Sequence, residues 1–515
     1  MFHTNPFTTM KKIQQTTLIA LMFCSILSLA QDSEKKSEQK PTIITQNIPA
    51  PIETKGQVII NGQTINYTTR TGYMVLKDES GKAKANIFFI AYTKDGVTDV
   101  AKRPVTYTFN GGPGSASVWL HMGCIGPKRI PMTEKGEALA PPYSYINNEY
   151  SWLDKTDLVF IDPVNTGYSR AAAGENERQF LGYTEDIESV GEFIRLYATK
   201  YGRWNSPKFL AGESYGTTRA AGLSGYLQDK YNMYINGVAL ISSILNFQTA
   251  RFEKGNDLPF SLFLPTYTAM AWYHKKIAPE YQADLQKTLR EVEKFATNEY
   301  STVLMKGDLA SEAEQMMVTE KLSKFTGLSK EYIKNANNRI EIGRFVKELL
   351  RNEGKTAGRL DGRFTGTDYD NAGERYEFDP SLDATISGPY SATINQYLRQ
   401  DLKYENDLPY LILTGRVQPW NYNNVQNQFL NVSETLRQAM SKNPYLKVWV
   451  AAGYYDLATP YYAAEYTFNH MMLRPEQKKN VNFTFFEAGH MMYIHKTSLI
   501  KLKQDADKFY ESALK

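Results

Sequence analysis

The chain has 515 residues, of which 42% are hydrophobic and 22% are charged, so it carries enough apolar material for a large folded core and too little charge for a disordered polymer. Lysine and arginine exceed aspartate and glutamate by only 59 − 55 = 4 residues. Because the basic residues form no long cluster, this near-neutral balance argues against a nucleic-acid partner.

The first thirty residues have the pattern of a secretory signal peptide. Lys11 and Lys12 precede an apolar run over 18–27, and small residues up to Ala30 stand before a polar stretch. This pattern predicts cleavage after Ala30, an exported protein that is periplasmic or extracellular, and no membrane attachment after cleavage. The alternative is a membrane anchor, but the run is shorter than the roughly 18 to 20 residues that span a bilayer.

The two cysteines are Cys24 and Cys124, and the predicted cleavage removes the first. No intrachain disulfide is then expected, so stability must come from a large core. We expect Cys124 to act as a small buried apolar residue and not as a nucleophile.

Residues 31–57 are polar and punctuated by proline, which predicts a disordered leader. Two runs of alternating hydrophobicity follow, joined at Asn61 and Gly62, a strong hairpin signal. Further strand-like sequence at 71–76 and 85–93 predicts an antiparallel entry to a sheet.

From residue 105 the pattern changes to short, continuous apolar runs, as expected for strands buried on both faces. The runs cover 105–109, 158–161, 208–211, 238–242, 447–451 and 481–486. Between two of them, apolar residues recur at helical spacing from Ile187 to Tyr197. This alternation predicts an α/β protein with a mostly parallel central sheet and helices on both faces.

The segment 247–440 interrupts this pattern with helical stretches at 281–300 and 329–350 and a glycine- and aspartate-rich passage at 353–373. It predicts a largely helical cap inserted between two parts of the core, 58–246 and 441–515.

The sharpest chemical signal is Gly212-Glu213-Ser214-Tyr215-Gly216, a GxSxG motif between a predicted strand and a predicted helix. A tight turn from strand to helix lifts the serine hydroxyl above the sheet and needs small residues on both sides. Ser214 is therefore the candidate nucleophile, and an ordinary turn serine is the alternative.

A serine hydroxyl needs a base, and the base needs an acid that holds its tautomer. In this class of site the acid and then the histidine follow the serine in the chain. His490 comes directly after a predicted strand and is favoured over His470 and His495, while Asp456 follows the preceding strand and precedes His490. The alternative role for Asp456 is to cap a turn.

Asn110-Gly111-Gly112-Pro113-Gly114 follows the strand at 105–109. Such a loop supplies an N–H group to an oxyanion hole, so Gly112 and Tyr215 are the expected donors, although a plain glycine-rich turn is the alternative. The sequence has no HExxH, paired CxxC, phosphate-loop or complete dinucleotide motif, so neither a metal nor a cofactor is expected.

Together, FNGGPGSAS, DPVNTGYS, GESYG, GYYDLATP and EAGHMMY resemble the serine carboxypeptidases of the α/β-hydrolase fold, particularly their bacterial secreted members. The resemblance runs in order along about 400 residues. It implies removal of single residues from the free C-terminus of a peptide, a triad of Ser214, Asp456 and His490, and the oxyanion donors Gly112 and Tyr215. It also implies that Asn110, Gly111 and Glu213 grip the terminal carboxylate of the substrate.

Glu213 could bind the terminal carboxylate of the substrate only if the Glu213 carboxyl group were protonated, because two carboxylates repel each other. This predicts peptide binding that favours acidic pH; the alternative is an exposed Glu213 that interacts with the helix dipole. The chain departs from the family pattern at Thr108, where many relatives have tryptophan, and at Cys124, where many have a second glutamate that partners the first.

The sequence thus predicts a secreted carboxypeptidase without cofactor. An esterase or acyltransferase with the same triad is the first alternative, because a fold does not fix a substrate. A non-catalytic peptide-binding protein is the second.

Overall fold

The computed structural model describes residues 48–515. The expected signal peptide, 1–30, lies outside the described residues, as does the expected leader up to residue 47. The strands are β1 Ile52–Ile60, β2 Gln63–Lys77, β3 Ala83–Lys94, β4 Val105–Phe109, β5 Lys128–Arg129, β6 Ile146–Asn147, β7 Asp157–Ile161, β8 Arg170–Ala171, β9 Lys208–Ser214, β10 Gly237–Ser243, β11 Thr356–Ala357, β12 Thr365–Gly366, β13 Lys447–Gly453 and β14 Val481–Phe486.

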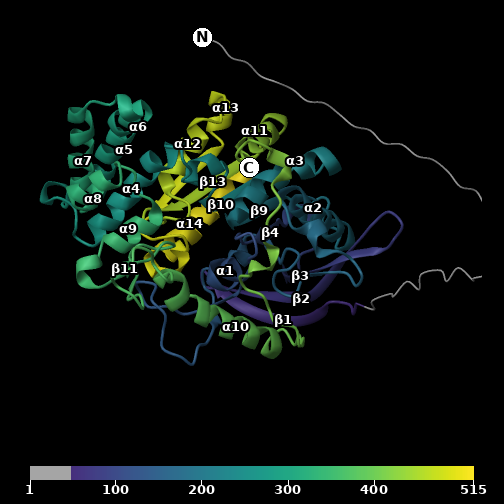
Figure 1. The fold of residues 1–515 in the computed structure, drawn as a ribbon. Helices are drawn as coiled ribbons and strands as arrows, with labels where there is room; N and C mark the ends of the chain where they lie inside the picture. Colours follow the sequence, from purple (N-terminus) through teal and green to yellow (C-terminus); the bar gives the residue numbers. More distant parts are fainter. Residues whose placement is uncertain (1–47) are drawn as a thin grey trace, which may run out of the picture. The chain divides into compact units, whose positions relative to one another are not determined.

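The helices are α1 Val118–Leu120, α2 Tyr183–Lys200, α3 Tyr215–Tyr231, α4 Leu258–Tyr273, α5 Leu285–Phe295, α6 Ser301–Lys306, α7 Glu312–Thr326, α8 Lys330–Asn335, α9 Ile342–Glu348, α10 Ser387–Gln400, α11 Ser433–Lys442, α12 Tyr461–Asn469, α13 Pro475–Lys478 and α14 Lys496–Ala513. Helices alternate with the strands from α2 to β10 and again from α11 to α14, whereas α4 to α9 follow one another without an intervening strand (Figure 1).

One sheet organises the part of the chain that the structure describes, in the order β1-β2-β3-β7-β4-β9-β10-β13-β14, with β8 paired to β3. The pairs from β1 to β7 are antiparallel. The pairs from β7 to β14 are parallel. Each of the six apolar runs in the sequence lies in one of these parallel strands, which confirms the mostly parallel sheet.

The hairpin between β1 and β2 turns at Asn61 and Gly62, as predicted. Both residues have positive φ, 50° and 75°, which matches the right-handed twist of the paired strands. Strand β1 begins at Ile52, so the last six residues of the expected leader belong to the sheet.

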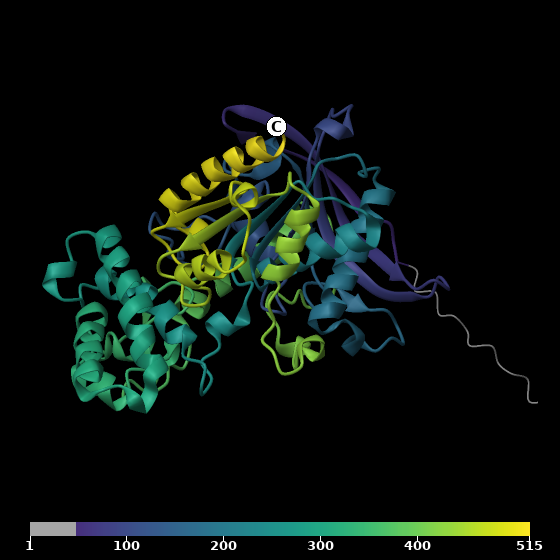
Figure 2. The same ribbon diagram turned by 90° about the horizontal axis from the view of Figure 1, so that it is seen from above.

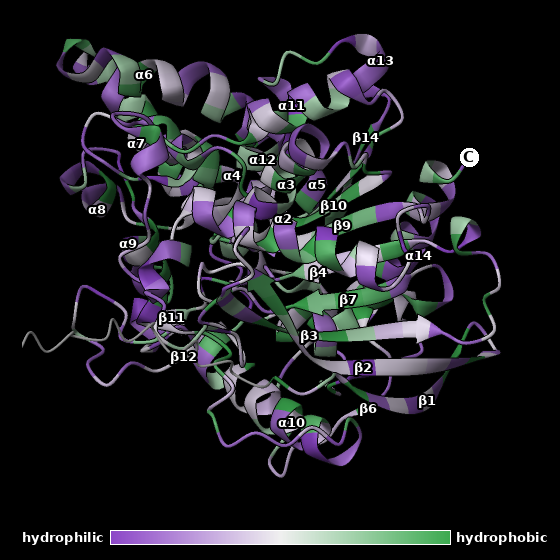
Figure 3. Ribbon diagram, turned by 90° about the vertical axis from the view of Figure 1, so that its right-hand side faces the viewer, coloured by the Kyte–Doolittle hydropathy of each residue, from purple (hydrophilic) through white to green (hydrophobic). Residues whose placement is uncertain are grey.

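Alternate side chains of the parallel strands enter two separate cores. Leu240 and Val448 pack with α2, α3 and α11 on one face. Ile241 and Trp449 pack with α10 and α14 on the other. Figure 2 shows α14, in yellow, lying along the sheet, and in Figure 3 the buried strands β7 and β10 are coloured mainly as hydrophobic. Helices on both faces were expected from the strand–helix alternation.

Helices α4 to α9 gather beside the carboxyl end of β13 in both ribbon views. Their apolar side chains form a third core, which also contains Tyr454, Tyr455 and Leu457 from the loop after β13. This helical cap therefore packs directly against the segment that carries Asp456.

Two helices within the expected insertion 247–440 pack with the sheet and not with the third core. Helix α10 belongs to the core beneath the sheet, and α11 packs on α3. Between them the chain pairs with core loops at Ser115, Gly167 and Gly182. Two of the bridge residues in this return segment, residues 401–432, are Leu411 and Leu413, which stand in a short apolar run that forms isolated bridges and no regular strand.

The helical stretch expected at 329–350 is interrupted. Asn337 and Asn338 separate α8 from α9 with φ values of 52° and 57°. Asparagine enters the left-handed region more easily than most residues, which allows the break. None of the helices within residues 48–515 combines the length and the hydrophobicity needed to cross a membrane.

Candidate active site

Ser214 is the last residue of β9 and directly precedes α3. Its backbone has φ 60° and ψ −129°, a region that non-glycine residues rarely occupy and that costs on the order of 1–3 kcal/mol. The turn leaves Ser214 half-exposed between buried neighbours. This is the sharp strand-to-helix turn that the GxSxG motif predicted.

Glycines on either side make this turn possible. A side chain at Gly212 would overlap the carbonyl of Gly216, and a Cβ at Gly216 would lie 2.7 Å from the carbonyl oxygen of Phe109. A Cβ at Gly111 would overlap the backbone nitrogen of Tyr215. The backbone of the loop after β4 therefore packs directly against the backbone at the start of α3.

The two expected oxyanion donors, Gly112 and Tyr215, lie at this contact between the loop after β4 and the start of α3. Tyr215 is the first residue of α3, where backbone N–H groups have no partner within the helix. Gly112 has φ 101°, a conformation that favours glycine. Both residues line the same cavity as Ser214.

Arg219, which the sequence did not single out, ties the loop to the helix. Its Nη1 donates to the carbonyl oxygen of Asn110 at 2.7 Å, and its Nε donates to Oδ2 of Asp186 at 2.7 Å. The guanidinium is almost fully buried over the rings of Phe109 and Tyr215. Arg219 therefore positions the oxyanion loop relative to the serine.

Asp456 lies in the loop after β13, behind His490. Its Oδ1 accepts from the backbone N–H groups of Ala458 and Thr459 at 2.7 and 3.1 Å, and its Oδ2 accepts from the Thr459 hydroxyl at 2.7 Å. Burial raises the pKa of this carboxyl, but the charge and hydrogen bond of His490 and the Thr459 donors outweigh it and lower the pKa below its ordinary value. Asp456 is therefore ionised.

His490 follows β14 and faces Asp456, with Nδ1 2.8 Å from Oδ2. Its backbone is fixed on both sides: its N–H donates to the carbonyl of Leu360 at 2.7 Å, and its carbonyl accepts from Ser242 Oγ at 2.6 Å. Burial lowers the pKa of His490, but the Asp456 carboxylate outweighs it, so the pKa is raised. Nε2 is left for the cavity, where a general base is needed.

Ser214 and His490 line the same cavity of about 370 Å³. Within the described residues, the Ser214 hydroxyl forms no hydrogen bond to His490. Catalytic hydrogen bonds are often long in the absence of substrate and tighten in the complex, so proton transfer requires the two groups to approach.

Glu213 also lines this cavity, and its carboxyl is buried. Tyr493 donates a 2.6 Å hydrogen bond to its Oε2. Burial raises the pKa of Glu213 to about 7, against the opposing effects of His490 and the Tyr493 hydroxyl. The alternative of an exposed Glu213 is therefore wrong, because the residue is 3% exposed.

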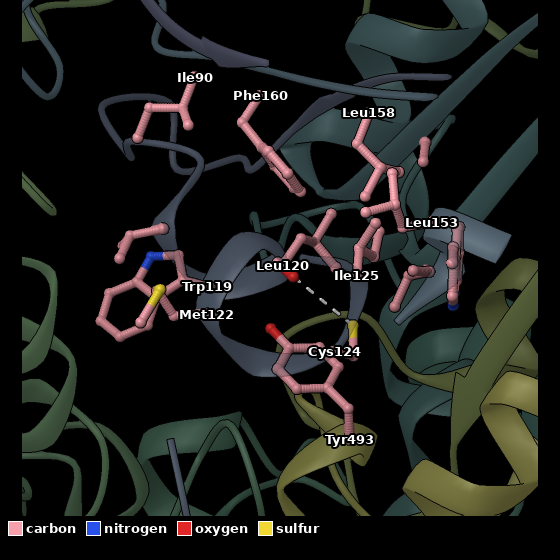
Figure 4. Packing of buried hydrophobic residues seen from close by; sticks show 14 of the residues in the cluster. Ile90, Trp119, Leu120, Met122, Cys124, Ile125, Leu153, Leu158, Phe160 and Tyr493 are labelled. Atoms are coloured by element: carbon pink, nitrogen blue, oxygen red, sulfur yellow. Dashed lines mark hydrogen bonds between the residues drawn. The ribbon is translucent and has the colours of Figure 1, made fainter. Parts of the chain in front are cut away.

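Cys124 lies beside Glu213 and Tyr493. It stands at the position where the family resemblance leads one to expect a second glutamate. Its Sγ faces the carbonyl oxygen of Leu120 at 3.8 Å, and Figure 4 shows the ring of Tyr493 next to it. Burial, with the charge of Glu213, raises the pKa of the Cys124 thiol well above its usual range, so it stays protonated. Cys124 is a buried thiol, as expected, and Tyr493 is the hydrogen-bond partner of Glu213.

Asn110 completes this end of the cavity. Its Oδ1 accepts from the backbone N–H of Leu120 at 3.1 Å, which fixes the amide plane. Its Nδ2 is buried on the side of Glu213, and a hydrogen bond from this amide is among the influences that lower the pKa of Glu213. The side chain thus keeps a donor on the Glu213 side of the cavity.

The structure brings all the candidate residues together. Seven of them line the cavity: Asn110, Gly111, Gly112, Glu213, Ser214, Tyr215 and His490. Asp456 contacts His490 from behind. Sequence reasoning missed Thr459 and Tyr493, although both lie in quoted motifs, and nothing in the local pattern marked Arg219. No group of three or more His, Cys, Asp and Glu side chains in residues 48–515 is arranged to hold a metal ion.

Comparison with known proteins agrees with this architecture. The family model described as serine carboxypeptidase matches residues 60–495. Carboxypeptidase Y of Saccharomyces cerevisiae is 32% identical over 155 residues, which cover 29% of this chain and 25% of that protein. Serine carboxypeptidase-like 45 of Arabidopsis thaliana is 21% identical over 258 residues, which cover 48% of this chain and 52% of that protein. The matches therefore span about half or less of these curated relatives.

Among solved structures, the prohormone-processing carboxypeptidase Kex1 of Saccharomyces cerevisiae superposes with a TM-score of 0.55 at 16% identity, covering 86% of this chain and 91% of that one. This likeness confirms the α/β-hydrolase fold. The family model covers most of the chain, so the chain belongs to the serine carboxypeptidase family.

Proposed function

We propose that this protein is a serine-type carboxypeptidase that releases the C-terminal residue of a peptide. The observation that carries the proposal is a single cavity lined by a strained serine, an imidazole paired with a buried carboxylate, and a second buried carboxyl with a pKa near 7. The first three groups supply acyl transfer, and the fourth supplies a means of recognising a terminal carboxylate.

In the proposed mechanism, Ser214 Oγ attacks the carbonyl carbon of the last peptide bond while His490 Nε2 takes its proton. The backbone N–H groups of Gly112 and Tyr215 stabilise the negative oxygen of the tetrahedral intermediate. His490 then donates the proton to the departing amino group, which leaves an acyl ester on Ser214. Water, activated by His490, hydrolyses the ester and restores the serine.

Asp456 stabilises the imidazolium that forms at His490 and holds Nδ1 protonated, so that Nε2 is the base. The raised pKa of His490 and the lowered pKa of Asp456 support this role, because each group favours the charged form of the other.

We further propose that protonated Glu213 donates a hydrogen bond to the terminal carboxylate of the substrate, together with Asn110 Nδ2 and the backbone of Gly111. The buried Asn110 amide beside Glu213 and the pKa of Glu213 near 7 support this role. The substrate is then a peptide with a free C-terminus. The signal-peptide pattern up to Ala30 supports export and a periplasmic or extracellular location.

Blocked dipeptides with free and with amidated C-termini test the proposal. A carboxypeptidase releases the last residue from the free acids and loses most of its activity on the amides. Hydrolysis of simple esters alone would favour an esterase or acyltransferase with the same triad. No turnover, and no labelling of Ser214 by an organophosphate, would favour a non-catalytic peptide-binding protein.

A further inference from the structure

Two arginines line the cavity that contains Ser214. They are Arg251, which precedes the cap helices, and Arg359, in the glycine- and aspartate-rich passage at 353–373. Within the described residues, neither guanidinium takes part in an ion pair. Arg251 is exposed and lies over the ring of Phe247 at 5.5 Å, whereas Arg359 is half-buried.

One of the two carboxyls that line the cavity, that of Asp379, is hydrogen-bonded to backbone groups. Asp379 accepts from the backbone N–H groups of Arg359 and Ser381 at Oδ1, at 3.1 and 3.0 Å, and from that of Leu360 at Oδ2, at 3.2 Å. These donors, with the Ser381 hydroxyl, satisfy its carboxylate. The only other carboxyl that lines the cavity in residues 48–515 is Glu213, which is bonded to Tyr493.

The backbone of Arg359 is held beside both catalytic loops. Its carbonyl accepts from the N–H of Leu457, next to Asp456, at 3.0 Å. The carbonyl of the following residue, Leu360, accepts from the N–H of His490. The guanidinium is near enough to His490 to oppose its protonation. Arg359 therefore brings a fixed positive charge to the reacting centre.

A guanidinium in a partly buried cavity forms strong, often bidentate hydrogen bonds with a carboxylate. In the proposed function, the terminal carboxylate of the peptide is held by Glu213 and Asn110. The Arg359 guanidinium has no ion-pair partner within the described residues. It is therefore available to bind a second negatively charged group of the same substrate.

We propose, resting on the carboxypeptidase function above, that Arg359 binds a carboxylate side chain of the substrate, so that the protein prefers peptides with aspartate or glutamate at a residue flanking the scissile bond. Arg251 at the mouth of the cavity adds to the positive field that attracts such peptides. The released residue and the residue before it are the two positions that flank the bond, and the same experiment distinguishes them.

The test compares kcat/KM for blocked dipeptides that carry glutamate or glutamine at one flanking position and alanine at the other. Wild type should favour glutamate over glutamine by about tenfold or more at one of the two positions, the size expected for a hydrogen bond to a charged group. Arg359→Gln should reduce this ratio to near one, and Arg359→Lys should retain part of it. The ratio should also fall as salt is added.

Arg437→Gln is the matched control. Arg437 is paired with Glu434 on the surface of α11, away from the cavity, so the glutamate preference should stay at the wild-type value. Circular dichroism and the thermal midpoint verify that each variant is folded. Because the readout is a ratio between isosteric substrates, a general loss of activity does not imitate the effect.

A wild-type ratio near one at both positions, or a preference that survives Arg359→Gln, would overturn the inference while leaving the carboxypeptidase function intact. Loss of discrimination between free and amidated C-termini in Arg359→Gln would also overturn it, because Arg359 would then hold the terminal carboxylate. If wild type releases no residue from any peptide, the proposed function fails and this inference fails with it.

Discussion

Tyr493 and Glu213 are joined by a 2.6 Å hydrogen bond although 280 positions separate them in the chain. The hydroxyl donates to the carboxyl in a buried environment shared with Cys124 and Tyr390. Burial, the dominant influence, keeps the pKa of Glu213 near 7, so the residue changes its charge within the physiological range. In the proposed function, this charge change controls binding of the substrate.

The pH dependence of peptide binding follows from the raised pKa of Glu213. Below about 7, Glu213 is protonated and donates to the terminal carboxylate; above it, the two carboxylates repel. The KM for a blocked dipeptide should therefore rise as pH increases through 7. Glu213→Gln, which is neutral at every pH, should flatten this profile.

A neutral ester substrate is the control for that experiment. His490 and Asp456 also face Glu213, and titration of His490 affects turnover of both substrates, whereas only the peptide meets Glu213. Parallel KM profiles for peptide and ester would contradict the role of Glu213.

Tyr493→Phe should shift the same profile to higher pH. The hydrogen bond from Tyr493 favours the charged form of Glu213 and lowers its pKa, so removing the hydroxyl should raise that pKa further above 7. The pH at which KM begins to rise should then increase, as measured with the blocked dipeptide. An unchanged or more acidic midpoint would show that the hydroxyl does not act on this carboxyl.

A substitution at Gly216 tests the close packing of the turn that carries Ser214 against the loop after β4. Gly216→Ala places a Cβ 2.7 Å from the Phe109 carbonyl oxygen, and this backbone contact cannot be relieved without moving the loop that carries Gly112. We expect kcat to fall and the free energy of unfolding to drop by about 1–3 kcal/mol, despite the better helix propensity of alanine.

Gly415→Ala is the matched control, because a Cβ there meets nothing within 4 Å and the residue has no positive φ. It should leave kcat unchanged and raise the free energy of unfolding slightly, by about 0.4–1 kcal/mol. Denaturant unfolding and dipeptide hydrolysis measure both variants. Equal effects of the two substitutions would refute the packing argument.

Asp361 should prove to be a positioning residue for His490. Its Oδ2 accepts from the backbone N–H of Gly489 at 2.9 Å, and it is paired with Arg363 in a buried salt bridge. Asp361→Asn leaves the guanidinium buried without its charge partner, so the free energy of unfolding should fall by about 3 kcal/mol. A shift of the Gly489 backbone should also lower kcat, with a smaller change in KM.

The double variant Asp361→Asn/Arg363→Gln isolates the pair. Removal of both charges should cost less stability than the sum of the two single substitutions, because no unpaired charge then remains in the interior. Strict additivity in denaturant unfolding would contradict this interpretation.

The central strands of the sheet were predictable because burial on both faces demands continuous apolar runs, and β4, β10 and β13 each stand out in this way, whereas β14 is an edge strand in which only Phe486 is buried. The candidate triad was predictable because each of its members follows a strand within a short motif. The structure puts Ser214 at the expected turn and His490 beside Asp456. These are features that a few neighbouring residues encode.

Features built from distant segments were not predictable. Residues 359–361 reach both loops of the candidate triad, and Tyr493 reaches Glu213, yet no local periodicity marks either contact. The packing of α11 on α3 is a further example, since these tertiary contacts leave no trace in the sequence pattern of α11 itself.

The central claim is that Ser214 releases C-terminal residues from peptides. The most direct measurement is release of the free amino acid from a blocked dipeptide acid and from its amide, by wild type and by Ser214→Ala. We predict hydrolysis of the acid by wild type, at least about a hundredfold slower reaction of the amide, and a loss of about 10⁴-fold or more in kcat in Ser214→Ala. Equal rates on acid and amide, or undiminished release by Ser214→Ala, would contradict the account.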